Sequence, residues 1–189
     1  TELDPDWHVY GGNFEEPVTQ ATLKAVGAFY GLSRERADAR RYPAIDPLDS
    51  WSRYEGFITA ERRKRMRLLL ARAHEIGQMM KVVGEEGTSL DDYVVFLKSE
   101  FLDAVYLQQD SFDPVDAAVS VERQRHIFSL LFEILSAKYS LAGKEEARTW
   151  FNELRQKFRD YNGSEWRSGE FDKQEALIRS QFEAKKAGV

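Results

Sequence analysis

The chain has 189 residues, of which 42% are hydrophobic and 31% charged, and its formal net charge at pH 7 is −5. The negative charge argues against nucleic acid as a partner, since proteins that neutralise phosphate backbones are basic, and the lack of cysteine excludes disulfides and thiolate metal sites. Length and composition are typical of a globular, mainly helical protein.

The start of the chain predicts little regular structure. It begins at Thr1 without an initiator methionine, which is typical of a piece of a longer polypeptide, and residues 1 to about 16 are rich in Asp, Pro, Gly and Asn, as loops are. No apolar run there or further along approaches the roughly 20 residues that cross a bilayer. We expect this segment to be a loop at the edge of another domain.

A first helix is predicted after this loop. Pro17 suits a first helical turn, Gly31 is placed to end the helix, and the apolar residues between them recur at helical spacing (Leu23, Val26, Tyr30). Ser33 is expected to cap a short second turn. The apolar run Tyr42–Ile45 predicts a brief buried strand, because the proline after Asp46 forces the chain out of the helical region.

From about residue 55 onward, apolar residues spaced three and four apart predict a succession of amphipathic helices. Thr59 and Ser89 are expected to cap the first two, the Ser89 hydroxyl accepting a hydrogen bond from the amide of Asp92. Gly84 closes the first helix, and the second ends near Tyr106. The apolar positions of these two helices are Met66, Leu69, Ala73, Ile76, Met80 and Val83, then Leu90, Val94, Leu97 and Phe101.

Three more helices are predicted from apolar periodicity alone. The second of them breaks at Asn162–Ser164, and the chain ends in a polar tail, Lys185–Val189, that we expect to fray. Short loops favour antiparallel neighbours, so the fold class is mainly α, with a helical bundle. The apolar positions are Ile127, Leu131, Ile134 and Leu135, then Ala147, Trp150, Leu154, Phe158 and Tyr161, then Phe171, Ile178 and Phe182.

The motifs of a stand-alone enzyme are missing from the sequence. No segment has the spacing of a phosphate-binding loop, G-x-x-x-x-G-K-[ST], and Gly84–Thr88 offers two glycines but adds two carboxylates that would repel a phosphate. His8, His74 and His126 lack any metal-ligand spacing. We therefore expect neither a catalytic residue nor a metal site, and no enzymatic activity of this chain alone.

A basic run, Arg62–Arg67, has two possible interpretations. Since the predicted apolar stripe begins inside the run at Met66, the simpler one is the solvated face of an amphipathic helix. The alternative is a docking surface for an acidic partner.

Two aromatic residues, Tyr42 and Phe112, also allow two interpretations. Aromatic side chains are most often core residues. An adenine ring, however, is held by stacking on flat side chains and by a few amide hydrogen bonds, which Gln108 and Gln109 could supply.

Three segments in order carry a resemblance to a known family: Gly11–Thr19, Arg40–Pro47 and Tyr106–Phe112. Together they resemble the C-terminal part of the catalytic A subunit of V/A-type rotary ATPases. The resemblance implies that residues 1–50 are the C-terminal edge of a RecA-like α/β nucleotide-binding domain, and that residues 51–189 are the C-terminal helical domain.

The resemblance also implies an adenine pocket. Tyr42 and Pro43 would line it from the nucleotide-binding side, while Gln109, Ser111 and Phe112 would close it from the helical side. Phosphate, magnesium and the catalytic carboxylate would lie upstream, so ATP or ADP with Mg belongs to the longer parent, and no tightly bound cofactor is expected here.

By the same resemblance, the parent couples ATP synthesis or hydrolysis to proton or sodium transport across a membrane, with the helical domain as its lever. Its partners would be B subunits in an alternating hexamer, central stalk subunits and, indirectly, the membrane rotor. It would be cytoplasmic, peripheral on the inner face of the cell membrane. The alternative is a free-standing helical adaptor that binds a partner through the Met66–Val83 stripe or the Trp150 face.

Overall fold

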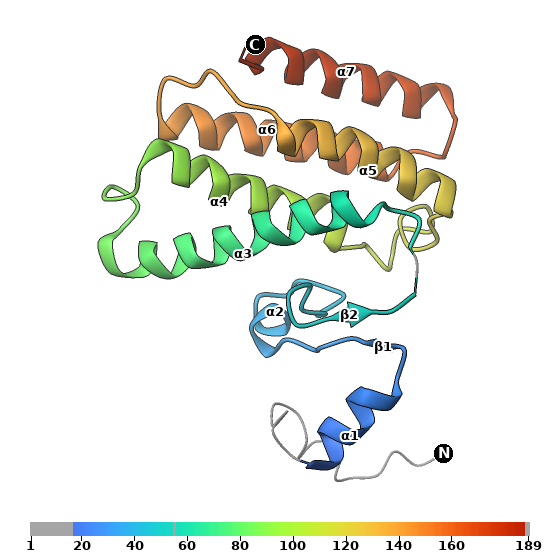
Figure 1. Ribbon diagram of the computed structural model, residues 1–189. Helices are drawn as coiled ribbons and strands as arrows, with labels where there is room; N and C mark the ends of the chain where they lie inside the picture. The colour runs from blue at the N-terminus through green and yellow to red at the C-terminus, as the bar shows by residue number, and fades with distance from the viewer. Residues whose placement is uncertain (1–16, 55, 188–189) are drawn as a thin grey trace.

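The computed structural model describes residues 17–54 and 56–187 (Figure 1). The loop expected over residues 1–16 lies outside this part of the chain. The elements are α1 (Pro17–Ala25), β1 (Ala28–Phe29), α2 (Arg34–Asp38), β2 (Trp51–Ser52), α3 (Ala60–Val83), α4 (Leu90–Leu102), the π-helical turn η2 (Asp103–Leu107), α5 (Val121–Ser136), α6 (Lys144–Asn162) and α7 (Gly169–Lys185).

The predicted helical bundle is confirmed from α3 to α7, and its helices begin where the capping residues predict. Thr59 Oγ1 accepts a hydrogen bond from the Arg62 amide at 3.5 Å, and Ser89 Oγ accepts one from the Asp92 amide at 3.1 Å. Gly84 ends α3 with φ of +75°, a conformation that favours glycine. Figure 1 shows α3 and α4 as a hairpin, with α5, α6 and α7 stacked above it.

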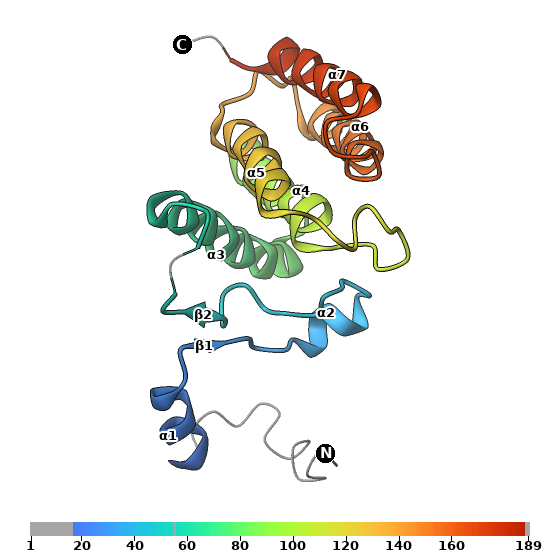
Figure 2. The ribbon, with the colours of Figure 1, turned by 90° about the vertical axis from the view of Figure 1, so that its right-hand side faces the viewer.

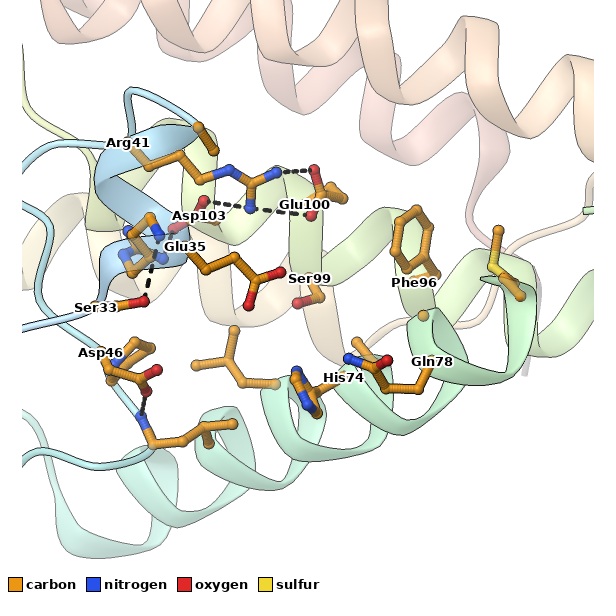
Figure 3. Close-up of a pocket in the computed structure, with 18 of the residues that line it drawn as sticks. Ser33, Glu35, Arg41, Asp46, His74, Gln78, Phe96, Ser99, Glu100 and Asp103 are labelled. Carbon is orange, nitrogen blue, oxygen red and sulfur yellow. Dashed lines mark hydrogen bonds and ion pairs between the residues drawn. The ribbon is translucent and has the colours of Figure 1, made fainter. Parts of the chain in front are cut away.

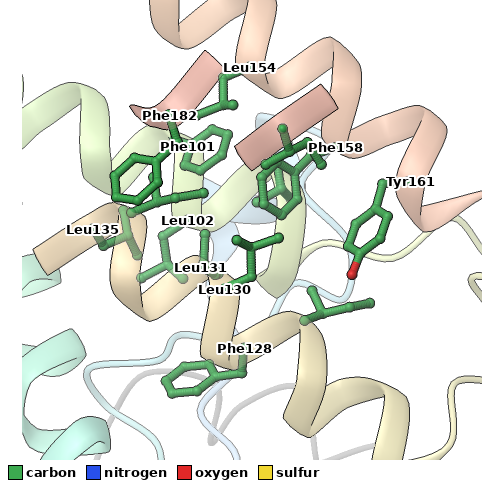
Figure 4. Packing of buried hydrophobic residues seen from close by; sticks show 14 of the residues in the cluster. Phe101, Leu102, Phe128, Leu130, Leu131, Leu135, Leu154, Phe158, Tyr161 and Phe182 are labelled. Carbon is green, nitrogen blue, oxygen red and sulfur yellow. The ribbon is translucent and has the colours of Figure 1, made fainter. Parts of the chain in front are cut away.

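The core lies where α4, α5, α6 and α7 meet (Figure 4). The rings of Phe101 and Phe158 make an edge-to-face contact there, with centroids 5.2 Å apart. The apolar positions predicted for the last three helices are all buried, because each helix turns the stripe that recurs every 3.6 residues toward its neighbours. The predicted stripe of α3 is buried only in part: Met66, Ala73 and Ile76 are inside, whereas Val83 is 51% exposed.

Two predictions for the first fifty residues are wrong. The first helix ends at Ala25 instead of Gly31, because Ala28 and Phe29 pair with Ser52 and Trp51 in a two-stranded antiparallel sheet. The run Tyr42–Ile45 forms no strand: only Ile45 makes an isolated bridge, to Leu32. The residues that follow Leu32 enter α2 directly after Ser33, and Pro43 has no N–H to donate. The pairing of these two segments therefore cannot extend beyond the single bridge. The cap predicted at Ser33 is confirmed, with its hydroxyl accepting from the Arg36 amide at 3.2 Å.

The tail was expected to fray from Lys185, but residues 185–187 are held. The Ser140 amide donates to the Lys185 carbonyl at 3.0 Å, and the Ala187 amide donates to the Lys138 carbonyl at 2.9 Å. These two backbone bonds pair the tail with the chain that follows α5, so the backbone donors and acceptors there are satisfied.

The segment that holds β1, α2 and β2 meets the helical bundle along one face of α3 and α4. Figure 2 shows β1, β2 and α2 lying next to α3, on the side away from α6 and α7. Within residues 17–54 and 56–187, none of the helices combines the length and apolarity that a bilayer crossing requires.

Candidate functional site

The structure brings together two of the segments that carry the predicted pocket. The Gln109 amide donates a hydrogen bond to the Tyr42 carbonyl at 3.0 Å, which places the chain around residues 42–43 beside the loop that follows η2. The Tyr42 side chain is 55% exposed and that of Phe112 is 96% exposed. All the predicted pocket residues are exposed: Tyr42, Pro43, Gln109, Ser111 and Phe112.

Exposure changes the interpretation of the two aromatic residues. A core aromatic would be buried, whereas the Phe112 side chain is almost fully exposed in the part of the chain that the structure describes. The Phe112 side chain is therefore accessible to a ligand or to another surface, as residues on loops often are.

The loop that carries Phe112 is held by three aspartate side chains. Asp110 Oδ1 accepts from the Phe112 amide at 2.9 Å, and Asp113 Oδ1 accepts from the Val115 amide at 2.8 Å. Asp116 Oδ2 accepts from the Asp110 amide at 2.7 Å, and burial raises the pKa of Asp116 above its usual value. Such turns satisfy the loop's own amides and so fix its backbone.

A buried carboxylate, Asp103, lies next to Arg41, the residue before Tyr42 (Figure 3). Its Oδ1 lies 2.6 Å from Arg36 Nη1, and its Oδ2 accepts from Arg41 Nη1 at 2.9 Å and from Gln108 Nε2 at 3.3 Å. Arg41 also donates through Nη2 to Glu100 Oε2 at 2.8 Å. Burial alone would lower the pKa of Arg41, but the bonds and charges of Glu100 and Asp103 raise it above its usual value.

A groove of about 580 Å³ runs from this cluster along α3 and α4. Its walls come from the segment around residues 33–48 on one side and from the helical hairpin on the other, and the side chains of Glu35, His74, Gln78 and Ser99 line it (Figure 3). On the α3 side, Arg67 fastens residues 47–50 to the hairpin. Its guanidinium donates to the carbonyls of Pro47 and Leu48 at 2.6 Å each and of Ser50 at 2.9 Å.

The basic run of α3 contributes to packing more than a simple solvated face would. The guanidinium carbons of Arg62 and Arg65 lie 4.9 Å and 5.1 Å from the centroid of the Phe132 ring on α5. Together with Arg67, which bonds to the carbonyls of residues 47–50, three basic side chains of the run therefore contact other parts of the chain. Lys64 is exposed. The docking interpretation stays a prediction.

Within residues 17–54 and 56–187, no group of three or more His, Asp or Glu side chains is placed to hold a metal ion. His74 is exposed beside the groove, and His126 Nε2 lies 2.6 Å from Glu175 Oε2. His8 lies outside the described part of the chain.

The Asp103 cluster is the part of the site that sequence reasoning missed. One signal was present: Asp103 interrupts an apolar run on a helix, between Leu102 and Val105, which are both buried. A carboxylate in that position has to be paired, since burying an unpaired charge is costly. The sequence does not say which cations pair with it.

Comparisons with known proteins give a consistent result. A family model described as the C-terminal domain of V and A type ATP synthase matches residues 59–142. The chain is 58% identical over 175 residues to the V-type ATP synthase alpha chain of Treponema denticola, covering 93% of this chain and 30% of that relative. It is 54% identical over 176 residues to the alpha chain of Borrelia duttonii, covering 93% and 31%. The chain thus spans about 30% of the length of these relatives.

One solved structure shares the fold. An ATP synthase subunit, NeqB from Nanoarcheaum equitans, superposes with a TM-score of 0.53 at 22% identity, covering 68% of this chain and 33% of that one. At this identity the likeness concerns the arrangement of the elements alone.

Proposed function

Because the chain belongs to the family of V-type ATP synthase alpha chains, as 58% identity over 93% of its length shows, we propose that it forms one wall of an adenine pocket and the helical lever of such a protein. In this proposal Tyr42 and Pro43 face the adenine ring from one side and Phe112 from the other. Gln109 and Ser111 offer hydrogen bonds at its edge.

The observation that carries the proposal is the 3.0 Å bond from the Gln109 amide to the Tyr42 carbonyl. It joins segments that are 67 residues apart in the sequence, and it leaves the aromatic side chains of both in contact with solvent. Exposed rings on two adjacent, backbone-fixed segments suit a ligand with a flat face, because bases stack on aromatic side chains with little dependence on sequence context.

The proposed division of the chain is at residue 50. Residues 1–50 would be the edge of a RecA-like nucleotide-binding domain and residues 51–189 the helical domain. The exposure of Tyr30 (67%) and Leu32 (83%) supports this, because neighbouring apolar side chains exposed on one segment are typical of a surface that another domain covers.

The wider proposal concerns the whole alpha chain. ATP or ADP with Mg would bind with its phosphates on parts of that protein outside this chain, and the alpha chain would alternate with B subunits in a hexamer around central stalk subunits. The assembly would lie on the inner, cytoplasmic face of the cell membrane and act on a membrane rotor that moves protons or sodium. Nucleotide occupancy would bias the helical domain between open and closed positions, because the domain contacts the adenine directly.

The adaptor alternative loses the Trp150 face and part of the Met66–Val83 stripe on which it was based, while Val83 stays 51% exposed. Met66 and Ile76 are 8% and 1% exposed, and Trp150 is 5% exposed, so these side chains pack within the chain itself. The backbone bond between the Tyr42 and Gln109 segments, with the rings of Tyr42 and Phe112 in solvent, favours the adenine wall.

The test is calorimetric titration of ATP and ADP into the full-length alpha chain, comparing wild type with Phe112→Ala. Since base–aromatic stacking contributes about 1–3 kcal/mol, we expect the dissociation constant to rise roughly 5- to 150-fold. The side chain is 96% exposed, so folding should not change. Val82→Ala, which removes an apolar side chain that is 85% exposed on the last turn of α3, is the matched control. Unchanged affinity in Phe112→Ala refutes the adenine wall.

A further inference from the structure

Asp103 is a buried acid with no role in the pocket as described so far. It is 4% exposed, at the point where α4 passes into η2, next to the core residue Leu102. Burying a carboxylate is costly unless its partners are well placed. A charge kept at such a position therefore requires specific partners, and these partners show what it holds together.

One oxygen of this carboxylate reaches both walls of the proposed pocket. Asp103 Oδ2 accepts from Arg41 Nη1 at 2.9 Å and from Gln108 Nε2 at 3.3 Å. Arg41 directly precedes Tyr42 in the sequence, and Gln108 directly precedes Gln109. The other oxygen lies 2.6 Å from Arg36 Nη1, a contact that ties α2 to the same point.

The π-helical turn brings Gln108 back to this carboxylate. The Gln108 amide donates to the carbonyl of Asp103 at 3.0 Å, five residues earlier, where an α-helical bond would go to residue 104. Gln108 is thus bonded to Asp103 through both its backbone and its side chain. Such wide turns interrupt regular helices at a cost, and they recur at functional sites.

We propose that Asp103 is the positioning residue of the adenine pocket, fixing the spacing of its two walls through Arg41 on one side and Gln108 on the other. This inference rests on the proposed function. Asp103 touches no nucleotide itself. It acts by holding the residues next to Tyr42 and Gln109, while the bond between those two residues closes the frame at the surface.

The test uses Arg41→Gln in the full-length alpha chain within its assembled complex. The Arg41 side chain is 34% exposed, so its loss perturbs folding less than loss of the buried Asp103. Lys185→Gln is the matched control, because the Lys185 side chain is 36% exposed and also pairs with a glutamate, Glu146, at the far end of the bundle. The measurements are the dissociation constants of ADP and of inorganic pyrophosphate, which probes the phosphate side alone.

We expect Arg41→Gln to weaken ADP roughly ten-fold, since small misplacements of binding groups are costly, and to leave pyrophosphate unchanged. Lys185→Gln should leave both unchanged. The positioning role is wrong if Arg41→Gln weakens ADP and pyrophosphate equally, as general destabilisation would, or if it weakens neither. Asp103→Asn should also raise the dissociation constant of ADP relative to that of pyrophosphate, as Arg41→Gln does.

Phe112→Ala separates this inference from the proposed function. If Phe112→Ala weakens ADP and Arg41→Gln does not, the pocket stands and the positioning role falls. If Phe112→Ala leaves ADP binding unchanged, both fall together.

Discussion

Replacing Arg123 by methionine tests how α5 is joined to the end of α6. Arg123 is 3% exposed, and its guanidinium donates to three carbonyls: to Asn162 at 2.5 Å, to Tyr161 at 3.5 Å and to Val115 at 3.4 Å. Two of these carbonyls belong to the last turn of α6, where helical carbonyls lack intrahelical partners. The third belongs to the loop that carries Phe112.

Two effects of Arg123→Met oppose each other. The substitution loses one short charged hydrogen bond, which contributes about 1.5–3 kcal/mol, and two bonds near the distance limit, which contribute little. It also removes the cost of burying a cation, a cost evident in the pKa of Arg123, which burial lowers despite the nearby Asp116. Because the Asn162 carbonyl would be left without its donor, we expect a net loss of about 2 kcal/mol.

The assay is thermal unfolding of the purified chain followed by circular dichroism at 222 nm. A loss of about 2 kcal/mol should lower Tm by roughly 4–8 °C for a chain of this size. Arg155→Met on the exposed face of α6 is the control, and it should change Tm little because Arg and Met have similar helix propensities. A Tm of Arg123→Met equal to or above that of wild type would refute the reasoning, since burial of the cation would then outweigh its bonds.

Two further predictions concern the bundle. Burial lowers the pKa of Lys98 to about 8, below its usual 10.5, so the unfolded chain binds more protons than the folded one between these pH values. The free energy of unfolding should therefore rise with pH across that window. Urea titrations should show a smaller rise in Lys98→Met, and an equal dependence on pH in the variant and the wild type would contradict the assignment. Leu154→Ala, at a fully buried position, should cost about 2–5 kcal/mol in urea unfolding. Leu177→Ala, at a position 43% exposed, should cost less than about 1 kcal/mol, and similar losses in the two variants would place the core elsewhere.

The helices could be predicted because their signals are local. A hydroxyl at the cap and apolar residues every three or four positions lie within one element, so Thr59, Ser89 and the stripes of the last three helices were sufficient. The end of α1 could not be predicted in this way. It depends on the pairing of Ala28 with Ser52, which lies 24 residues further along the chain.

The candidate site was predictable only in its exposed part. The aromatic residues Tyr42 and Phe112 stand out by type and by the family motifs around them, whereas Asp103 stands out only as a charge in an apolar run. Its bond to Arg41 joins residues 62 positions apart, and no periodicity encodes such a pair. The adenine role of the exposed residues stays a prediction.

The segment from Ser33 to Ser50 is fastened to the helical hairpin at two points, to α3 through Arg67 and to the end of α4 through Glu100 and Asp103. A body held at one point can still pivot about it, whereas a body held at two separated points follows every rotation of its support. We therefore expect a tilt of α3 and α4 to carry Tyr42 along with it. Within the proposed division at residue 50, this segment would then be the part of the nucleotide-binding edge that moves with the helical domain, and the ring of Tyr42 would move with it.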